Sequence, residues 1–312
     1  MDEISEDVKK RIEELKEKYE AQGQDFKAYL EGLLYQKYTS YWDYVSVDTL
    51  LTLQKPRTDI PDEMIFIIYH QITELYFKLV LHEMQQISTN AKTITIEKFA
   101  EHLRRINAYF INLTNSFFIM IDGMEVEQFL KFRMSLLPAS GFQSAQYRTI
   151  EICATDFIRL VEKSKRNELA EKSIDEKYKQ IYWQAGATDL ATGKKTLTLT
   201  QFEQKYSEQL LRIAIENKDC TLWAVYKSLS IEAQKDEKLI AELRNFDKNV
   251  NVNWPLVHYK SAVRYLQKAT TDVAATGGTN WQKYLPPRMQ LRVFYPELWS
   301  NEELENWGKS ND

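Results

Sequence analysis

Four histidines, at positions 70, 82, 102 and 258, are the side chains through which this chain could transfer protons or bind a metal. The sequence contains no Gly-rich phosphate loop of the GxGxxG or GxxxxGK[ST] type and no GxSxG nucleophile elbow. No histidine follows a glutamate by three residues, so the Glu-x-x-His signature of di-iron helical bundles is absent as well. Histidine chemistry in this protein must therefore draw on these four side chains.

His70 and His258 have surroundings that suit an aromatic ligand. Phe66 precedes His70 by one helical turn and Phe77 follows it by two, which would place a polarisable imidazole on an aromatic helix face. Ser261, a small residue, lies one turn after His258 and leaves room for a flat group beside the ring. One neutral imidazole is also the usual proximal ligand of a haem iron. Spacing alone favours the alternative in each case, which is an ordinary core histidine.

The other two histidines are expected to play no part in such a site. His82 lies about 120° around the same helix from His70, so the two cannot face one pocket. A structural hydrogen-bonding role is the expectation for it. His102 follows Glu101 and lies off the apolar face of its helix, and it is predicted to be solvated.

Arg148 is the arginine that the spacing singles out. Its planar guanidinium is suited to binding a carboxylate. Glu151 follows three residues later, so an ordinary ion pair on a helix surface is an equal alternative.

Composition indicates the fold class and excludes several kinds of partner. Only 9 glycines and 7 prolines interrupt 312 residues, which favours long helices over a many-stranded sheet. The net charge of −4 argues against nucleic acid and against a polybasic membrane anchor. The acidic start MDEISEDVKK is unlike a secretory signal, and polar residues interrupt the most apolar stretch, 108–120. Two cysteines cannot build a disulfide framework. We therefore expect a soluble, cytoplasmic, all-α protein with no membrane or nucleic-acid partner.

Helical periodicity predicts the first elements of the chain. An amphipathic helix opens it, and a second helical run with a few breaks covers residues 26–53. A further helix runs from Asp62 to about Ile87 and carries His70. The apolar start of this helix, residues 64–68, is predicted to be buried on all sides. Thr95 can cap the next helix, whose apolar residues recur at steps of four and three: Phe99, Leu103, Ile106, Phe110, Leu113, Phe117 and Met120.

The second half of the chain supplies the elements around Arg148 and His258. A helix opening at Ser140-Gly141 carries Arg148, and one starting at Trp254-Pro255 carries His258. Residues 185–195 are predicted to form a loop and residues 196–200 a short extended segment. Capping-box spacing then predicts a helix beginning at Thr200.

Around these residues the sequence resembles the tryptophan 2,3-dioxygenase family. The matching blocks are Tyr41-Trp42-Asp43-Tyr44, Val47-Asp48-Thr49-Leu50-Leu51, Asp62-Glu63-Met64-Ile65-Phe66-Ile67-Ile68-Tyr69-His70-Gln71, Glu74-Leu75, His82-Glu83, Phe132-Arg133, Pro138-Ala139-Ser140-Gly141-Phe142-Gln143-Ser144, Gln146-Tyr147-Arg148, Trp254 with His258, Thr276-Gly277-Gly278 and Pro296-Glu297-Leu298-Trp299. The blocks keep their order and approximate separation from about residue 38 to 300, whereas residues 160–245 match weakly.

The resemblance implies one all-helical bundle domain over residues 1–312 that binds haem between its helices, with residues 1–37 as an N-terminal arm. It implies a b-type haem, active as Fe²⁺, and a homotetramer. It also implies the opening of the indole ring of L-tryptophan by O2 to N-formylkynurenine. One alternative is a haem-dependent oxygenase of another indole or aromatic amino acid, and a second is a non-catalytic helical haem-binding or scaffold protein.

The resemblance also implies roles for individual residues. His258 looks like the proximal iron ligand and His70 like the distal, catalytic histidine that faces the indole N–H. Arg148 and Thr276 look like the groups that hold the carboxylate and the ammonium of the substrate. Phe66, Tyr41 and Tyr44 look like walls of the indole pocket. In this family the Tyr-x-x-Tyr segment, here Tyr41 to Tyr44, reaches in from a neighbouring subunit.

Overall fold

The structure is a computed structural model that describes residues 4–188, 193–266 and 286–309. The chain divides into two compact units, residues 1–53 and residues 54–312. Over the described residues both units consist of helices and connecting segments, and two isolated bridges are the only extended pairings there. The all-α fold class expected from the sequence is therefore confirmed.

The first unit contains four helices, α1 (Glu6–Glu20), α2 (Phe26–Tyr35), α3 (Tyr41–Val45) and α4 (Val47–Leu50). None of them has a buried residue within the chain. The apolar positions of α1 are exposed, including Val8 and Ile12. The amphipathic opening helix is confirmed, and its apolar face packs in part on α2, where Tyr19 stacks on Tyr29 (3.9 Å between ring centroids).

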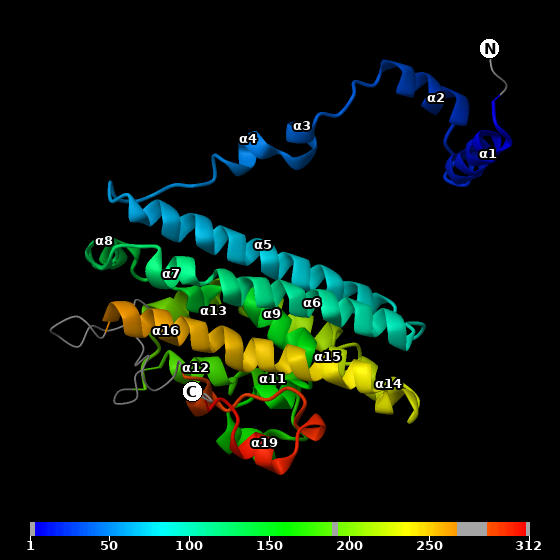
Figure 1. The fold of residues 1–312 in the computed structure, drawn as a ribbon. Helices are drawn as coiled ribbons and strands as arrows, with labels where there is room; N and C mark the ends of the chain where they lie inside the picture. The colour runs from blue at the N-terminus through cyan, green and yellow to red at the C-terminus, as the bar shows by residue number, and fades with distance from the viewer. Residues whose placement is uncertain (1–3, 189–192, 267–285, 310–312) are drawn as a thin grey trace. The chain divides into compact units, whose positions relative to one another are not determined.

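The second unit is a stack of long helices joined by short ones (Figure 1). Its longer elements are α5 (Asp62–Thr89), α6 (Ile96–Ser116), α9 (Ala145–Ala154), α13 (Leu197–Glu216), α15 (Glu237–Lys248) and α16 (Trp254–Leu266). Its short elements are α7 (Phe118–Asp122), α8 (Val126–Phe132), η1 (Arg133–Leu136), η2 (Gly141–Gln143), η3 (Phe157–Leu160), η4 (Lys163–Lys165), α10 (Arg166–Leu169), α11 (Ile174–Tyr178), α12 (Tyr182–Gly186), α14 (Leu222–Ser228), η5 (Ala233–Lys235), η6 (Asn249–Asn253), α18 (Pro287–Gln290), η7 (Pro296–Leu298) and α19 (Asn301–Glu305).

The core lies where α6 packs on α5 along one side and on α15 along another. All seven apolar residues of the predicted stripe on residues 99–120 are buried, which confirms the strongest periodic signal of the sequence. The Thr95 hydroxyl accepts a hydrogen bond from the Lys98 amide (3.3 Å), so the predicted cap is confirmed too. Aromatic contacts continue this core across the bundle, from Phe77 to Phe110 (6.2 Å between ring centroids) and from Phe110 to Phe246 (6.1 Å).

Three local predictions are wrong. The helix predicted to begin at Thr200 begins at Leu197, because the Thr196 hydroxyl accepts from the Leu199 amide and caps it there. Residues 197–200 are consequently helical and not extended. The start of α5 is not buried on all sides either. Its buried positions pack on α6 and α9, while a stripe on another face stays open within the chain: Met64, Ile68, Ile72, Leu75 and Leu79.

Asp247, at the end of α15, fastens the C-terminal segment to the bundle. Its carboxylate accepts hydrogen bonds from the amides of Phe294 (2.9 Å) and Tyr295 (3.0 Å) and from the Trp299 indole N–H (3.1 Å). The side-chain amide of Asn251 donates a fourth hydrogen bond to this carboxylate (2.7 Å). Burial raises the pKa of Asp247 to about 6, although these donors act in the opposite direction.

We predict that Asp247→Ala lowers the free energy of unfolding by about 3 kcal/mol or more, because it leaves several buried donors without an acceptor. The same change at Asp175, which is exposed on α11, should alter it by less than about 0.5 kcal/mol. Urea denaturation of both variants measures the difference, and equal midpoints would contradict an anchoring role for Asp247.

Candidate active site

His258 lies in the second turn of α16 and is held there by its own helix. Its Nδ1 is 2.9 Å from the main-chain oxygen of Trp254. A carbonyl oxygen can only accept, so Nδ1 carries the proton and Nε2 keeps its lone pair. The imidazole packs against the rings of Trp254 (4.3 Å between centroids) and Phe117 (4.5 Å). His258 therefore presents a basic nitrogen from an apolar, aromatic wall.

The pKa of His258 is lowered to about 4. Burial is the main cause, and the nearby imidazole of His70 acts in the same direction, whereas the hydrogen bond to Trp254 opposes them. His258 is consequently neutral at physiological pH, which is the form in which imidazole binds a metal.

His70 repeats this arrangement on α5. Its Nδ1 is 2.7 Å from the main-chain oxygen of Phe66, so it too is protonated on Nδ1 and holds its lone pair on Nε2. The rings of Phe66 and His70 lie 4.1 Å apart. Burial lowers the pKa of His70, with opposing contributions from the Phe66 carbonyl and from Glu74. This imidazole is a neutral hydrogen-bond acceptor.

His70 and His258 lie on helices that share an aromatic part of the core. The imidazole of His70 is close enough to lower the pKa of His258 slightly. Phe117, at the end of α6, contacts both helices. Its ring lies against His258 on α16 and meets Tyr69, the residue before His70 on α5, edge-on (5.6 Å between ring centroids). On the His70 side, Phe66 packs on Phe132 (5.7 Å). The structure thus places Phe66 against His70, and aromatic packing connects the His70 helix with the helix of His258.

These residues fit a haem. Iron-porphyrin binding needs one neutral imidazole with an available nitrogen, fixed by a hydrogen bond from its other nitrogen, and apolar walls for the macrocycle. His258 satisfies the first requirement through its bond to Trp254, and the rings of Phe117 and Trp254 beside it contribute to the second. Within the described part of the chain, neither histidine Nε2 has a hydrogen-bond partner.

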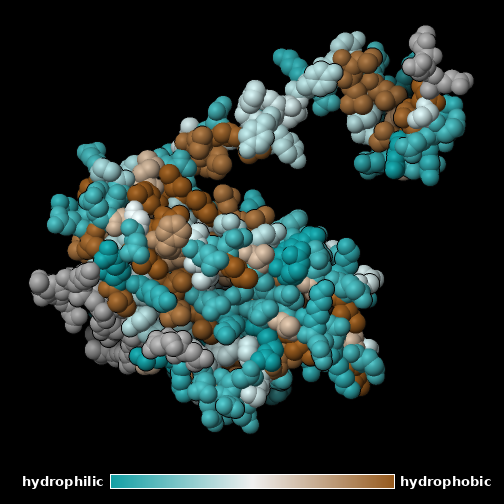
Figure 2. Space-filling view, viewed as in Figure 1, coloured by the Kyte–Doolittle hydropathy of each residue, from teal (hydrophilic) through white to brown (hydrophobic). Residues whose placement is uncertain are grey.

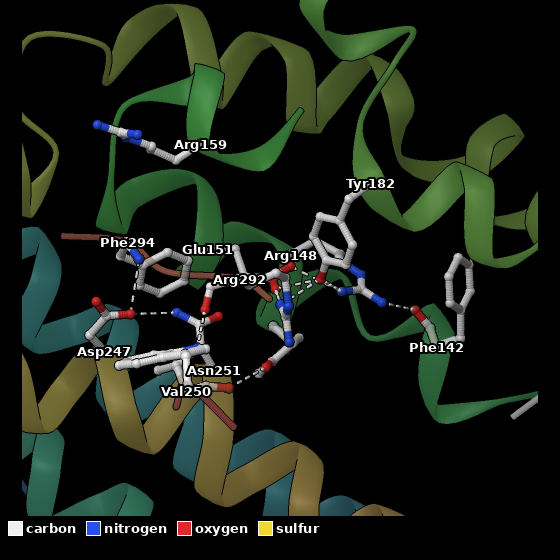
Figure 3. Close-up of polar contacts among 12 residues, drawn as sticks. Phe142, Arg148, Glu151, Arg159, Tyr182, Asp247, Val250, Asn251, Arg292 and Phe294 are labelled. Atoms are coloured by element: carbon white, nitrogen blue, oxygen red, sulfur yellow. Dashed lines mark hydrogen bonds and ion pairs between the residues drawn. The ribbon is translucent and has the colours of Figure 1, made fainter. Parts of the chain in front are cut away.

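Arg148 lies in a different, closed network on α9 (Figure 3). Its Nη1 donates to Glu151 (3.0 Å) and to the Tyr182 hydroxyl (2.8 Å). Arg292, from the C-terminal segment, binds the other oxygen of Glu151 and the same hydroxyl (2.6 Å). Both arginines and Glu151 are buried, and the guanidinium of Arg148 also lies over the Trp183 ring (5.0 Å).

The role of Arg148 as a carboxylate clamp therefore stays a prediction, since its guanidinium is already bound to a carboxylate of the protein. The alternative pair with Glu151 is present, but it is buried and not on a helix surface. Sequence reasoning missed Arg292 and Tyr182, which no local spacing connects with Arg148. It also passed over Arg133, although Phe132-Arg133 is one of the matching blocks: this arginine is 2% exposed and directly follows the Phe132 that packs on Phe66.

His102 is not solvated as predicted. Its Nδ1 lies 2.6 Å from a carboxylate oxygen of Glu83 on α5, and its side chain is only 12% exposed. The Tyr109 hydroxyl donates to the other oxygen of Glu83 (3.4 Å). His102 thus belongs to a polar bridge between α5 and α6, because its helix turns it toward a buried acid and not toward water.

The remaining predicted residues belong to the first unit or fall outside the described residues. Tyr41 and Tyr44 belong to α3 in the first unit, where both side chains are largely exposed. Thr276 lies outside the described residues.

Comparison with known proteins identifies the family of this chain. The family model described as tryptophan 2,3-dioxygenase matches residues 33–275. A tryptophan 2,3-dioxygenase of Ruegeria sp. (strain TM1040) is 28% identical over 273 residues, which cover 84% of this chain and 91% of that protein. One from Herpetosiphon aurantiacus is 27% identical and covers 84% of this chain and 96% of its own length. Tryptophan 2,3-dioxygenase 2 of Ralstonia nicotianae is 42% identical over 123 residues, 36% of this chain and 33% of that protein. With a family model matching more than half of its length, the chain belongs to the tryptophan 2,3-dioxygenase family.

Proposed function

We propose that this protein is a haem-dependent dioxygenase that opens the indole ring of L-tryptophan with O2 to give N-formylkynurenine. The observation that carries the proposal is the pair of neutral imidazoles, His70 and His258. Each donates a hydrogen bond from Nδ1 to a main-chain carbonyl, and each keeps the lone pair on Nε2 available for a ligand. Family membership supplies the substrate class and the reaction. Such a site needs no nucleophile and no pair of catalytic carboxylates.

His258 would hold the haem iron on its proximal side. The bond to Trp254 fixes its tautomer, and Phe117 limits the rotation of its ring. Haem b in the ferrous state would supply the reaction with O2, while the protein orients the substrate and excludes water.

His70 would orient the indole ring. Its Nε2 accepts, so it can take a hydrogen bond from the indole N–H, the only donor on that ring system. Phe66 lies beside His70 and would line the face on which the indole packs. A hydrogen bond at one end and ring packing along the side would fix the reacting carbons relative to the oxidant, and this fixed orientation is a large part of the rate acceleration in such reactions.

Two buried arginines are candidates for the substrate carboxylate. Arg148, implied by the resemblance, is bound to Glu151 and shares that acid with Arg292. Arg133 begins η1 immediately after Phe132, whose ring packs on Phe66, and burial lowers the pKa of its guanidinium. The position of Arg133 beside the ring that packs on Phe66 supports it as the residue that binds the substrate carboxylate. Arg148 would instead stabilise the fold through its ion pair with Glu151. The role of Thr276 toward the ammonium remains part of the proposal.

The protein would assemble as a homotetramer. The stripe on α5 defined above leaves apolar side chains exposed along one helix face, and apolar surface gathers over that helix in Figure 2. In the first unit the side chains of Tyr41 and Tyr44 are 73% and 84% exposed. Both features support an assembly in which the Tyr-x-x-Tyr segment serves a neighbouring subunit.

The activity is tested with reduced, haem-loaded protein, L-tryptophan and O2. We expect the absorbance of N-formylkynurenine to appear with time. Haem binding without any turnover of tryptophan or of another indole would instead support a non-catalytic haem protein.

Replacing His258 with Ala should abolish the axial bond to iron and deplete bound haem. His82, which is exposed on α5, serves as the control, and His82→Ala should keep the parent spectrum. The measurement is the haem-to-protein ratio with the visible spectrum. A His258→Ala protein with full haem and an unchanged spectrum would refute the assignment.

Replacing His70 with Ser should lower turnover roughly tenfold, since one neutral hydrogen bond contributes about 0.5–1.5 kcal/mol. Haem content should stay at the parent level. Steady-state kinetics and the haem ratio distinguish the outcomes: complete inactivity with normal haem would make His70 an obligatory base, and loss of haem would make it an iron ligand.

Arg133→Ala should lower catalytic efficiency, whereas Arg148→Ala should lower the stability of the fold. Without Arg133 the substrate carboxylate lacks its partner in a dry pocket, and kcat/KM for tryptophan should fall by the equivalent of about 2–5 kcal/mol. Tryptamine, which has no carboxylate, should be turned over equally poorly by this variant and the parent. Without Arg148 the buried Glu151 loses one partner, so unfolding should become easier by about 3–5 kcal/mol. If Arg148→Ala alone erases the discrimination between tryptophan and tryptamine, Arg148 is the clamp after all.

A further inference from the structure

The backbone that leads into the His258 helix is not regular. Between α15 and α16, residues 249–253 form a π-turn, in which the Trp254 amide donates to the Asn249 carbonyl five residues earlier. A π-turn inserts one extra residue into a helix and turns everything after it by about 100° relative to an unbroken α-helix. The direction in which His258 points therefore depends on whether this turn is kept.

Pro255 leaves this turn one hydrogen bond short. In the π pattern the amide of residue 255 would donate to the Val250 carbonyl, but proline has no N–H. The Val250 carbonyl is buried, so a missing donor at this position would be costly. The hydroxyl of Tyr147 on α9 supplies one: it donates to the Val250 oxygen at 2.9 Å (Val250 is labelled in Figure 3).

Other contacts hold the turn from two more directions. The Asn249 side chain donates to Asn107 on α6 (3.1 Å) and accepts from Asn253 (2.8 Å). Asn251 donates to Asp247, which also binds the C-terminal segment. Tyr147 differs from these contacts because its hydroxyl donates to a main-chain carbonyl of the turn, that of Val250. This is the carbonyl to which Pro255 has no N–H to donate.

The turn is linked to His258 through aromatic packing. Tyr147 packs on Phe77 (5.5 Å), and Phe77 meets Trp254 edge-on (5.8 Å). Trp254 is the first residue of α16, the acceptor for His258 Nδ1 and a wall against its ring. A change in the turn would thus move both the carbonyl that fixes the His258 tautomer and the ring that fixes its orientation.

We propose that Tyr147 is a positioning residue for His258: its hydroxyl replaces the donor that Pro255 lacks, and it thereby holds the π-turn that aims the imidazole. This inference rests on the proposed role of His258 as the haem ligand. Tyr147 itself touches neither the cofactor nor the substrate in this account.

The test compares Tyr147→Phe with Tyr226→Phe in the full-length, haem-loaded protein. Tyr226 is a matched control because it is also buried and its hydroxyl also donates to a main-chain carbonyl, that of Gln234 (2.6 Å). We expect Tyr147→Phe to shift or broaden the iron–histidine vibration of the ferrous protein and to speed haem transfer to excess apomyoglobin roughly fivefold. Tyr226→Phe should change neither quantity, although both variants lose one buried hydrogen bond. The same response in both variants, or in neither, overturns the proposal.

A second substitution tests the mechanism itself. Pro255→Ala restores an N–H that can donate within the turn, so in the Tyr147→Phe background it should return the vibration and the haem transfer rate toward parent values. The Tyr147 hydroxyl also lies near Arg292 and contributes to the pKa of that guanidinium. Pro255→Ala restores no contact with Arg292. A double variant that stays as defective as Tyr147→Phe would therefore overturn the role assigned to the Val250 hydrogen bond.

His258→Ala separates this inference from the proposed function. If the iron–histidine vibration persists in that variant, the axial assignment and the positioning role both fail. If the vibration disappears in His258→Ala but is unmoved in Tyr147→Phe, the axial assignment stands and only the positioning role is overturned.

Discussion

The site depends on one interaction that occurs twice, the hydrogen bond from a histidine Nδ1 to the carbonyl one turn earlier in its own helix. It fixes the tautomer of His70 against Phe66 and that of His258 against Trp254. A residue on a helix always has such a carbonyl within reach, so the helix itself orients both imidazoles without a carboxylate partner. A carboxylate would raise the pKa of the ring and favour its charged form, whereas here burial lowers the pKa of both.

Two buried carboxylates lie in networks separate from the two histidines. Glu151 on α9 forms ion pairs with Arg148 and Arg292, and Glu83 on α5 contacts His102 on α6. Each network joins elements distant in sequence, and removing one member would leave a buried charge unpaired. Such networks favour one arrangement of the helices over its neighbours. Glu151 and Glu83 are thus paired within the scaffold, apart from the two neutral histidines.

The parts of the structure that were predictable from the sequence are those governed by local period. Seven apolar residues between Phe99 and Met120, which span α6 and α7, repeat with the helical spacing, and all are buried. The Thr95 cap depends only on residues within one turn. The environments of Arg148 and His102 were not predictable, because their partners come from other elements: Arg292 lies 141 residues from Glu151, and Glu83 lies 19 residues from His102. A single sequence carries no signal for such pairs. The exposed stripe of α5 was misjudged for a related reason, since apolar composition indicates burial without indicating what covers the surface.

Pro255 shows how a correct local rule can miss the structure around it. Proline suits the first turn of a helix because the amide there lacks an intrahelical partner, and α16 does begin one residue earlier. The chain, however, reaches this point already helical, through α15 and the π-turn, so the missing amide does leave a carbonyl that needs a donor. That donor comes from Tyr147, 103 residues away in sequence. The proline therefore marks both the start of the His258 helix and the place where that helix depends on α9.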